Sequence, residues 1–487
     1  MIDTRKMNRS AVQTKTGNGV SRRTFLTCAG GAAAFFVTGC KTGGWLAGVP
    51  SLRFGVVSDI HVTTPESCAM FEKALRYFKK RNVDAVLVSG DLTDWGIRSS
   101  LEYVKATWDR VFAQTGVVPL FCTGNHDFEG WHYSDMAVDM RAHGHTEAEA
   151  LVKLGLSAEW ERIIGEKYAP IRVRTVKGYD FISSEWDSFK KFPEWMAANG
   201  ERFKGTKPFF YFQHPPAKGT TRDGDGWADK GAAFEALKEF PNAISFTGHS
   251  HRPFTDELSI WQDTFTAFAT PSLSYANLPP GHENSRDRKK GPKPLAMVPI
   301  PDRRDLRGGQ GYVVSVYTDR MVVERIDIEE DCAEGAPAWI VPLAGKEKPY
   351  DLAARTAASV APRFPDGAAL HVDTRNTENR EGKWMVAMNC VFPAAIPPKG
   401  ARVFDYEIRA VTKDGSSPLV KKFLSPAYSR MAKYEPKTMR FWFDITEVPQ
   451  DVDYRLEVRA FNCFGKASAP LVSKVWHSVP APAKAKP

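Results

Sequence analysis

Residues 54–61 read Phe-Gly-Val-Val-Ser-Asp-Ile-His, an apolar run that ends in a carboxylate and an imidazole. Four more polar islands occur in the same context, each after a short run rich in β-branched or aromatic residues. They are Gly90-Asp91, Gly124-Asn125-His126-Asp127, Gln213-His214 and Gly248-His249-Ser250-His251. Such a run followed by such an island predicts a buried strand that leads into a loop.

The apolar runs also predict how these loops meet. The runs cover residues 54–57, 83–88, 117–121, 208–212 and 243–246. Strands of one α/β sheet that end at a common edge bring together loops that are far apart in the sequence, and α/β enzymes keep their chemistry there. We therefore expect an α/β fold with all five islands at one edge.

Seven side chains of the islands are candidate metal ligands. They are Asp59, His61, Asp91, Asn125, His214, His249 and His251. Their oxygen and imidazole nitrogen atoms suit Mn, Fe, Zn or similar ions, and the absence of a thiolate from the set disfavours a structural zinc knot. Taken singly, each island is more simply a turn or a surface histidine. Five of the eleven histidines follow predicted strands, however, and this order favours a metal site.

The order D-x-H, G-D, G-N-H-D, H and G-H-x-H resembles that of the calcineurin-like metallophosphoesterases over residues 51–328. The resemblance implies a four-layer α/β/β/α sandwich that binds two divalent metal ions, with Mn, Fe and Zn all open. It implies that the first metal is held by Asp59, His61, Asp91 and His251. It implies that the second is held by Asp91, Asn125, His214 and His249, so that Asp91 bridges the two.

The resemblance also implies a mechanism of phosphoester hydrolysis. Two cations about 3.5–4 Å apart lower the pKa of a shared water, hold it as hydroxide and neutralise the phosphoryl oxygens. His126 is the candidate general acid that protonates the leaving group. By analogy Asp94 orients its imidazole, with Asp127 as a rival that alternatively caps the following helix.

Departures from the family patterns narrow the expected substrate. Trp95 stands where phosphoprotein phosphatases have a phosphate-binding arginine, and Asp94 stands where purple acid phosphatases have a tyrosine ligand. The chain therefore resembles the cyclic-nucleotide phosphodiesterase branch, and we expect a diesterase rather than a monoesterase. Trp95 and Trp131 are candidate substrate-binding residues, although such a tryptophan is more often a half-buried packing residue. A helical insertion is expected over residues 131–168.

The first forty residues predict the compartment. Residues 21–26, Ser-Arg-Arg-Thr-Phe-Leu, resemble a twin-arginine export signal, and the apolar stretch 29–37 is too short to span a bilayer. Residues 37–40 resemble a lipobox in which Cys40 is lipidated; the alternative is an ordinary signal with an accidental cysteine. We expect a signal peptide at 1–39, a tether at 40–50 and a membrane-anchored lipoprotein facing the periplasm or the cell surface.

Charge does not point to a nucleic acid partner. The chain carries net +9, but residues 1–39 hold six basic residues and one acidic residue, so the remainder is near +4. Basic residues concentrate between 286 and 307, where a solvated loop and an anion-attracting surface are both open interpretations. No aromatic-interleaved basic array is present.

The pattern changes after a Pro- and Ala-rich stretch, 329–366, which we expect to be a connector. Every second residue from Phe404 to Ala410 and from Tyr454 to Ala460 is apolar, which predicts a β-sandwich over 367–478. Residues 454–465 resemble the penultimate strand of a fibronectin type III domain. Cys390 and Cys463 form either a disulfide or two free thiols, and the tail 479–487 is expected to be disordered.

Two functions follow from this organisation. One is a lipid-anchored dimetal phosphoesterase that acts on a small phosphoester. The other is a catalytically silent scaffold whose C-terminal sandwich binds an extracellular glycan or protein. The scaffold would tolerate missing metal ligands, and none of the seven is missing.

Overall fold

A computed structural model describes residues 48–129, 140–146, 149, 156–221, 227–284, 308–343, 347–378, 384–398, 401–426, 428 and 436–479. The expected signal peptide, Cys40, Trp131, the basic stretch 286–307 and the tail lie outside the described residues. Among the helices that are described, none combines the length and the apolar character needed to cross a membrane.

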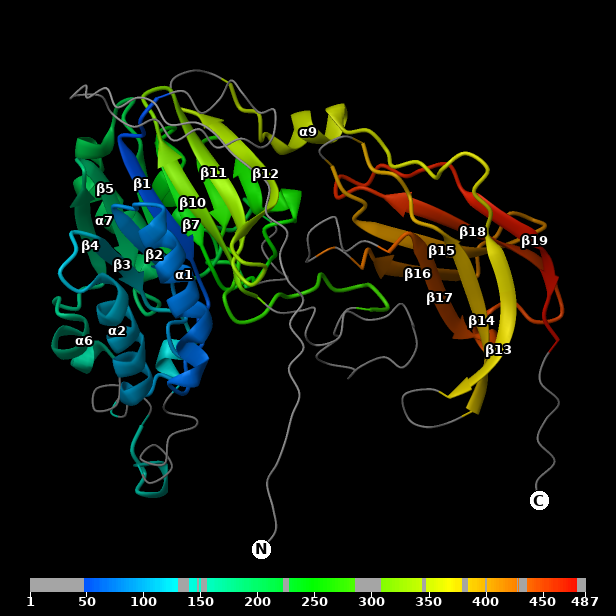
Figure 1. The fold of residues 1–487 in the computed structure, drawn as a ribbon, viewed down its shortest axis with the longest axis horizontal. Helices are drawn as coiled ribbons and strands as arrows, with labels where there is room; N and C mark the ends of the chain where they lie inside the picture. Colours follow the sequence, from blue (N-terminus) through cyan, green and yellow to red (C-terminus); the bar gives the residue numbers. More distant parts are fainter. Residues whose placement is uncertain are drawn as a thin grey trace, which may run out of the picture. The chain divides into compact units, whose positions relative to one another are not determined.

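The first sheet contains the strand formed by the opening sequence motif. Its order is β12-β11-β10-β1-β2-β3 (Figure 1). The strands are β1 (Leu52–Val57), β2 (Ala85–Ser89), β3 (Val118–Cys122), β10 (Gln310–Val316), β11 (Arg320–Asp327) and β12 (Ala333–Pro342). Strands β1, β2 and β3 are parallel, so their carboxyl ends lie at the same edge. Strands β10, β11 and β12 continue the sheet in antiparallel fashion.

The second sheet has the order β4-β5-β6-β7-β9-β8. Its strands are β4 (Ile171–Val176), β5 (Tyr179–Ser184), β6 (Phe209–Gln213), β7 (Ala243–Thr247), β8 (Ile260–Gln262) and β9 (Thr266–Ala269). Strands β5, β6, β7 and β9 are parallel. All five predicted apolar runs are therefore strands, three in the first sheet and two in the second.

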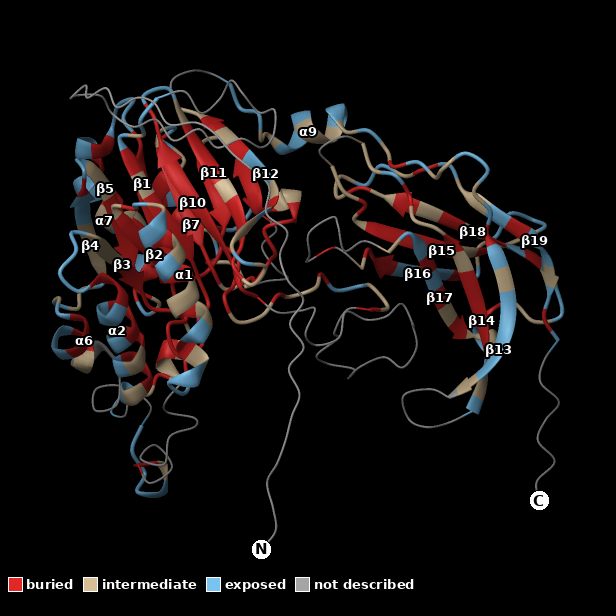
Figure 2. Cartoon of the chain, viewed as in Figure 1, coloured by how far each residue is buried: buried red, intermediate tan, exposed pale blue. Residues whose placement is uncertain are grey.

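Three buried clusters define the layers. Apolar side chains of β1 and β2 in the first sheet and of β5, β6 and β7 in the second share one core. The opposite face of the first sheet packs on α1 (Ala69–Lys80), α2 (Arg98–Phe112) and α6 (Leu156–Ile164). The opposite face of the second packs on α7 (Phe192–Asn199) and α8 (Ala232–Leu237). The chain thus folds as a mixed α/β unit with helices outside two sheets, and the buried strands appear in red in Figure 2.

Helix α1 shows why these segments cover the sheet. Phe71, Ala74, Leu75 and Phe78 are fully buried, and their i, i+3, i+4, i+7 spacing places them on one helix face. Short 3-10 helices complete this unit at Glu66–Cys68, His126–Phe128, Phe189–Lys191, Gly200–Phe203 and Glu257–Ser259. The helix at His126–Phe128 begins within the third polar island.

The expected connector 329–366 contains a strand and a helix that its Pro- and Ala-rich composition did not predict. Strand β12 pairs with β11, and a helix, α9, spans Leu352–Ala358. Trp339 and Val341 of β12 are buried in the core between the two sheets. Burial of these two alternate side chains holds the strand on the sheet in spite of the Pro and Ala around it, so the first sheet extends beyond the expected limit at residue 328.

Among its described residues from His371 onward, the C-terminal region is all-β apart from one 3-10 helix at Ile445–Glu447. One sheet has the order β13-β14-β17 and the other the order β16-β15-β18-β19. The strands are β13 (His371–Glu378), β14 (Trp384–Pro393), β15 (Asp405–Thr412), β16 (Leu419–Leu424), β17 (Thr438–Asp444), β18 (Asp453–Phe461) and β19 (Leu471–His477). Both sheets contribute to one buried cluster.

The predicted alternation is confirmed in β18, where Tyr454, Leu456, Val458 and Ala460 are buried in this cluster. In β15 it is confirmed from Tyr406 onward, whereas Phe404 precedes the strand and is only half-buried. The fibronectin type III likeness stays a prediction. Cys390 is a buried free thiol, so it forms no disulfide with Cys463.

Candidate metal centre

Backbone hydrogen bonds join the loops that carry the polar islands. Asp59 N donates to Gly90 O at 3.1 Å, and Gly248 N donates to His214 O at 2.9 Å. The glycines of the islands allow this close packing. A Cβ atom on Gly124 would overlap the Asp91 carboxylate and lie 2.5 Å from Asp91 N, so no larger residue fits without moving Asp91.

The island backbones are also unusual in conformation. Five of the seven candidate ligands have φ between 50° and 66°, in the left-handed region that non-glycine residues seldom occupy. These residues are Asp59, His61, Asp91, His249 and His251. Backbone strain of this kind persists where the surrounding structure fixes it, and it is concentrated at functional sites.

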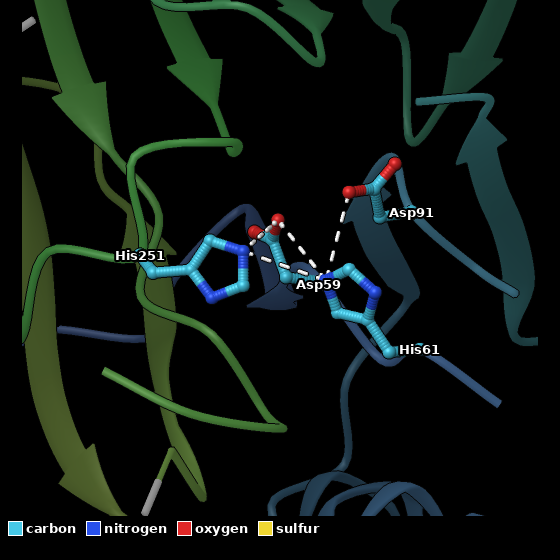
Figure 3. A group of neighbouring side chains, drawn as sticks. All are labelled: Asp59, His61, Asp91 and His251. Carbon is cyan, nitrogen blue, oxygen red and sulfur yellow. Dashed lines mark hydrogen bonds and ion pairs between the residues drawn. The ribbon is translucent and has the colours of Figure 1, made fainter. Parts of the chain in front are cut away.

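A first cluster is formed by Asp59, His61, Asp91 and His251, whose side chains point toward one another (Figure 3). His251 Nε2 lies 3.0 Å from Asp59 Oδ1 and 3.4 Å from His61 Nε2. His61 Nε2 lies 3.6 Å from Asp91 Oδ2. All four residues are buried, so their ligand atoms face each other away from bulk water.

A second cluster shares Asp91 with the first and adds His214 and His249. His214 Nε2 lies 3.1 Å from Asp91 Oδ2 and 3.1 Å from His249 Nδ1. Asp91 Oδ2 is therefore between His61 of one cluster and His214 of the other. This is the position that a bridging carboxylate would occupy.

The ring nitrogens that point away from the clusters have fixed partners. His61 Nδ1 lies 2.9 Å from Asp94 Oδ1, His214 Nδ1 lies 2.8 Å from Ser89 O, and His251 Nδ1 lies 2.9 Å from Tyr275 O. Each partner is an acceptor, so each Nδ1 carries a proton, and Nε2 is the ring atom that can bind a cation. Outer partners of this kind orient histidine ligands in metal sites.

The carboxylate and imidazole groups of the clusters stabilise each other's charged forms. Burial alone would raise the pKa of Asp59, but the charges of His251, His214 and His61 hold it well below its usual range. Burial alone would lower the pKa of His214, but Asp91 raises it to about 9. Burial and the neighbouring His214 lower the pKa of His249 to about 3. Without a cation, the carboxylates are compensated by protons on histidine.

Two buried oxygen atoms test whether divalent cations fit here. Asp91 Oδ2 and Asn125 Oδ1 receive no hydrogen bond from any described residue. A buried acceptor without a donor is costly, and a bound cation removes that cost. Two carboxylates, one amide oxygen and four imidazoles are a donor set for Mn, Fe or Zn. The residues present therefore fit a dimetal centre, although the identity of the metals does not follow from them.

His126 lies beside the first cluster rather than in the second. Its Nδ1 atom is 2.9 Å from Asp94 O and 3.2 Å from Asp94 Oδ1, and its ring centroid is 4.5 Å from that of His61. Burial alone would lower the pKa of His126, but the hydrogen bond with Asp94 and the charge of Asp91 raise it to about 10. A half-buried, protonated imidazole at this position has the properties of a general acid.

Asp127, the rival partner of His126, has a different position. Its buried carboxylate accepts hydrogen bonds from the backbone N–H groups of Leu92, Thr93 and Gly124. These bonds tie the loop after β2 to the loop after β3. The carboxylates that contact the His126 ring are those of Asp94 and Glu129, and Asp127 instead positions the loops that carry Asp91 and Asn125.

Tryptophan residues near the second cluster were missed in the sequence. The Trp186 ring centroid lies 5.9 Å from that of His214 and 5.6 Å from that of His249, and Trp227 lies 5.1 Å from His249. Trp186 follows the end of β5, at the same sheet edge as His214, and this position is the only signal that could have found it. Trp95 is half-buried next to Asp94, and its proposed stacking stays a prediction.

Residues 52–253 match the family model described as calcineurin-like phosphoesterase. No curated protein is similar enough in sequence to count as a relative. Among solved structures, a conserved uncharacterized protein from Streptococcus pneumoniae, described as a predicted phosphoesterase, is 13% identical with a TM-score of 0.27. The alignment covers 60% of this chain and 97% of that protein.

Two further structures are similarly distant. GAP50, described as the anchor in the inner membrane complex of Plasmodium, is 11% identical over 61% of this chain and 90% of its own, with a TM-score of 0.35. A purple acid phosphatase from yellow lupin seeds is 10% identical over 60% of this chain and 55% of its own, with a TM-score of 0.33. Likenesses at these scores carry no argument about function.

Proposed function

We propose that the calcineurin-like metallophosphoesterase domain at residues 52–253 is a working dimetal hydrolase that cleaves phosphoesters, with diesters as its preferred substrates. The observation that carries the proposal is the position of Asp91. One of its oxygens faces His61 at 3.6 Å and His214 at 3.1 Å, and no described group gives it a hydrogen bond. An acceptor shared by two clusters in this way is suited to two cations.

The residues of the chain divide the work between binding and proton transfer. Asp59, His61, Asp91 and His251 would hold one metal, and Asp91, Asn125, His214 and His249 would hold the other. Two divalent metals there would supply a water of lowered pKa and positive charge opposite the phosphoryl oxygens. His126 donates the proton that the leaving oxygen needs, and Asp94 fixes its ring so that Nε2 faces the substrate.

The absence of two phosphate-binding arginines from their family positions supports a preference for diesters. The position of a phosphate-binding arginine is occupied by Trp95, and Phe128, Glu129 and Gly130 follow Asp127 without a second arginine. A monoester dianion gains more than a diester monoanion from such side chains. A site without these two arginines therefore favours the less charged diester, as expected for the cyclic-nucleotide phosphodiesterase branch.

Export and lipid anchoring are part of the proposal on sequence grounds. The Arg22-Arg23 signal and Cys40 support a lipoprotein that faces the periplasm or the cell surface. The twin-arginine route carries folded cargo, which suits a protein that acquires metals before export. A C-terminal β-sandwich would then space the enzyme from the membrane or bind a glycan or protein.

The proposal is tested by metal depletion and reconstitution. Protein lacking residues 1–39 is treated with chelator and assayed on methyl p-nitrophenyl phosphate and p-nitrophenyl phosphate, before and after addition of Mn²⁺, Fe²⁺ or Zn²⁺. We expect turnover only after reconstitution, and faster turnover of the diester. A faster monoester reaction would refute the diester preference, and inactivity with every metal would favour the silent scaffold.

A further inference from the structure

Two indole rings lie close to one imidazole of the second cluster. The ring centroids of Trp186 and Trp227 are 5.6 Å and 5.1 Å from that of His249. Both indoles are tilted by 48° from the imidazole plane, so neither is stacked flat on it. His249 is half-buried, whereas the other three histidine ligands are buried. The indoles thus stand at the open side of the second cluster.

Trp186 is held by a rigid part of the fold. Its backbone N–H donates to Thr123 Oγ1 at 3.1 Å, and its ring packs 5.5 Å from that of Phe189. The preceding residue, Glu185, is fully buried and accepts hydrogen bonds from Thr123 N and from Arg172. Trp186 is therefore anchored to the strand end that leads into Asn125.

Hydrogen bonds of the nearby residue Asp229 hold the segment of Trp227. Two residues later, the buried carboxylate of Asp229 accepts hydrogen bonds from Gln213 Nε2 at 3.0 Å, from Gly231 N at 2.8 Å and from Ala233 N at 2.6 Å. Gln213 immediately precedes the ligand His214. The segment that carries Trp227 is thus tied to the end of β6, and the indole keeps its place beside His249.

We propose that Trp186 and Trp227 line a subsite that binds the face of a ring carried by the phosphoester. The ring is either a nucleobase or a sugar with an apolar face. The inference rests on the proposed function, since it names the substrate class of the same site. Indoles bind both kinds of ring through their π faces. Half-exposed indoles fixed before binding lose little conformational entropy when they do so.

Packing alone makes a different prediction. If the indoles only shield His249, their removal affects metal binding and hydrolysis of every ester alike. If they bind a ring, their removal affects the esters that carry one. The two accounts are therefore separated by substrates that share a leaving group and differ in the group that stays on phosphorus.

The first test compares Trp186→Leu and Trp227→Leu with the wild type on two such diesters. These are the p-nitrophenyl ester of thymidine 5′-phosphate and methyl p-nitrophenyl phosphate. We expect each substitution to lower kcat/KM for the thymidine ester about tenfold more than for the methyl ester, as the loss of one stacking contact implies. Equal losses on both esters would overturn the subsite.

Two controls accompany this test. Trp195→Leu removes a half-buried tryptophan of α7 in the same α/β unit, and it should change the ratio between the two esters by less than about twofold. Metal content of each variant is measured by mass spectrometry. Loss of metal in the Trp186 and Trp227 variants with an unchanged ester ratio would assign the indoles to support of His249 and refute the proposal.

The second test does not need turnover. Calorimetric binding of adenosine monophosphate, glucose 1-phosphate and methyl phosphate is measured on metal-loaded wild type and on both variants. We expect at least one ring-bearing ligand to bind about tenfold more tightly than methyl phosphate, with the advantage lost in the variants. Selectivity for adenosine monophosphate alone assigns the base, and an equal advantage of glucose 1-phosphate assigns the sugar. Equal affinities of all three would overturn the subsite, whereas ring-selective binding without hydrolysis would refute only the proposed function.

Discussion

Asp94 Oδ1 lies 2.9 Å from His61 Nδ1. The residue that we expected to orient the general acid therefore also orients an expected metal ligand. Its carboxylate is 3.2 Å from His126 Nδ1, so one side chain connects the first cluster to the candidate proton donor. Burial alone would raise the pKa of Asp94, but hydrogen bonds with His126 and His61 keep it well below its usual range. Asp94 is thus ionised at neutral pH.

Asp94→Asn is predicted to shift the alkaline side of the pH–rate profile to lower pH. A general acid acts only while protonated, so the rate falls as pH rises through its pKa. Burial lowers the pKa of His126 and the Asp94 hydrogen bond opposes this, so removal of the Asp94 charge lowers that pKa. The measurement is kcat/KM against pH at full metal occupancy.

Glu129→Gln is the matched control for Asp94→Asn. Glu129 Oε2 is 3.5 Å from the same His126 nitrogen, so its charge acts on His126 from farther away. We expect a smaller shift in the same direction. An alkaline limb that stays in place in Asp94→Asn would show that His126 is not the group that titrates.

His126→Ala is predicted to separate metal binding from proton donation. Metal content should stay intact because His126 lies outside both clusters. Hydrolysis of alkyl phosphoesters should fall about 10²–10⁴-fold, whereas nitrophenyl esters, whose leaving group needs no proton, should slow much less. Parallel kinetics on both ester types would count against the assignment.

Gly124→Ala is predicted to weaken metal binding and to destabilise the fold by about 1–3 kcal/mol. The added methyl group would overlap the Asp91 carboxylate, and the backbone on the other side cannot move because Gly124 N donates to Asp127 at 2.8 Å. Gly116→Ala is the control, since no atom lies within 4 Å of its Cβ position. Denaturation and metal analysis of both variants check the prediction, and equal stability of the two would contradict it.

Glu185→Ala is predicted to destabilise the protein by about 1–3 kcal/mol. Glu185 is fully buried, and its removal leaves the buried Thr123 N–H without its acceptor and Arg172, whose side chain is 10% exposed, with Glu166 but without Glu185. Glu102→Ala breaks a pair with Arg162 that is about half exposed on both sides, and it should cost about 0–1 kcal/mol. Urea denaturation compares the two variants, and similar midpoints would refute a structural role for the buried pair.

The sequence predicted the parts of the site that lie on strand ends. Each apolar run became a strand, and the islands after β1, β2, β3, β6 and β7 meet because parallel strands end at one edge. The local pattern of an apolar run and a polar loop contains this information. The order of the motifs, which resembles that of the calcineurin-like metallophosphoesterases, then identified the residues that form the two clusters.

Residues whose roles depend on tertiary contacts were not predicted. Trp186 and Trp227 lie in no motif, and only folding brings both indoles to His249. The sequence suggests Asp127 as a partner of His126 or a helix cap, whereas two of its hydrogen bonds come from the single loop of Leu92 and Thr93, 35 and 34 residues away. Strand β12 was not predicted because its local sequence pattern is poor for a strand. Its pairing with β11 outweighs that pattern.

We propose that Asp91 joins two metals in a hydrolytic site. The most direct measurement is the metal content of wild type and Asp91→Asn, taken together with their turnover of p-nitrophenyl phosphate and bis-p-nitrophenyl phosphate with and without Mn²⁺. We predict two metals and metal-dependent diester turnover in the wild type, and loss of both in Asp91→Asn. Full occupancy of both metals in Asp91→Asn, or turnover that needs neither metal nor Asp91, would contradict the account.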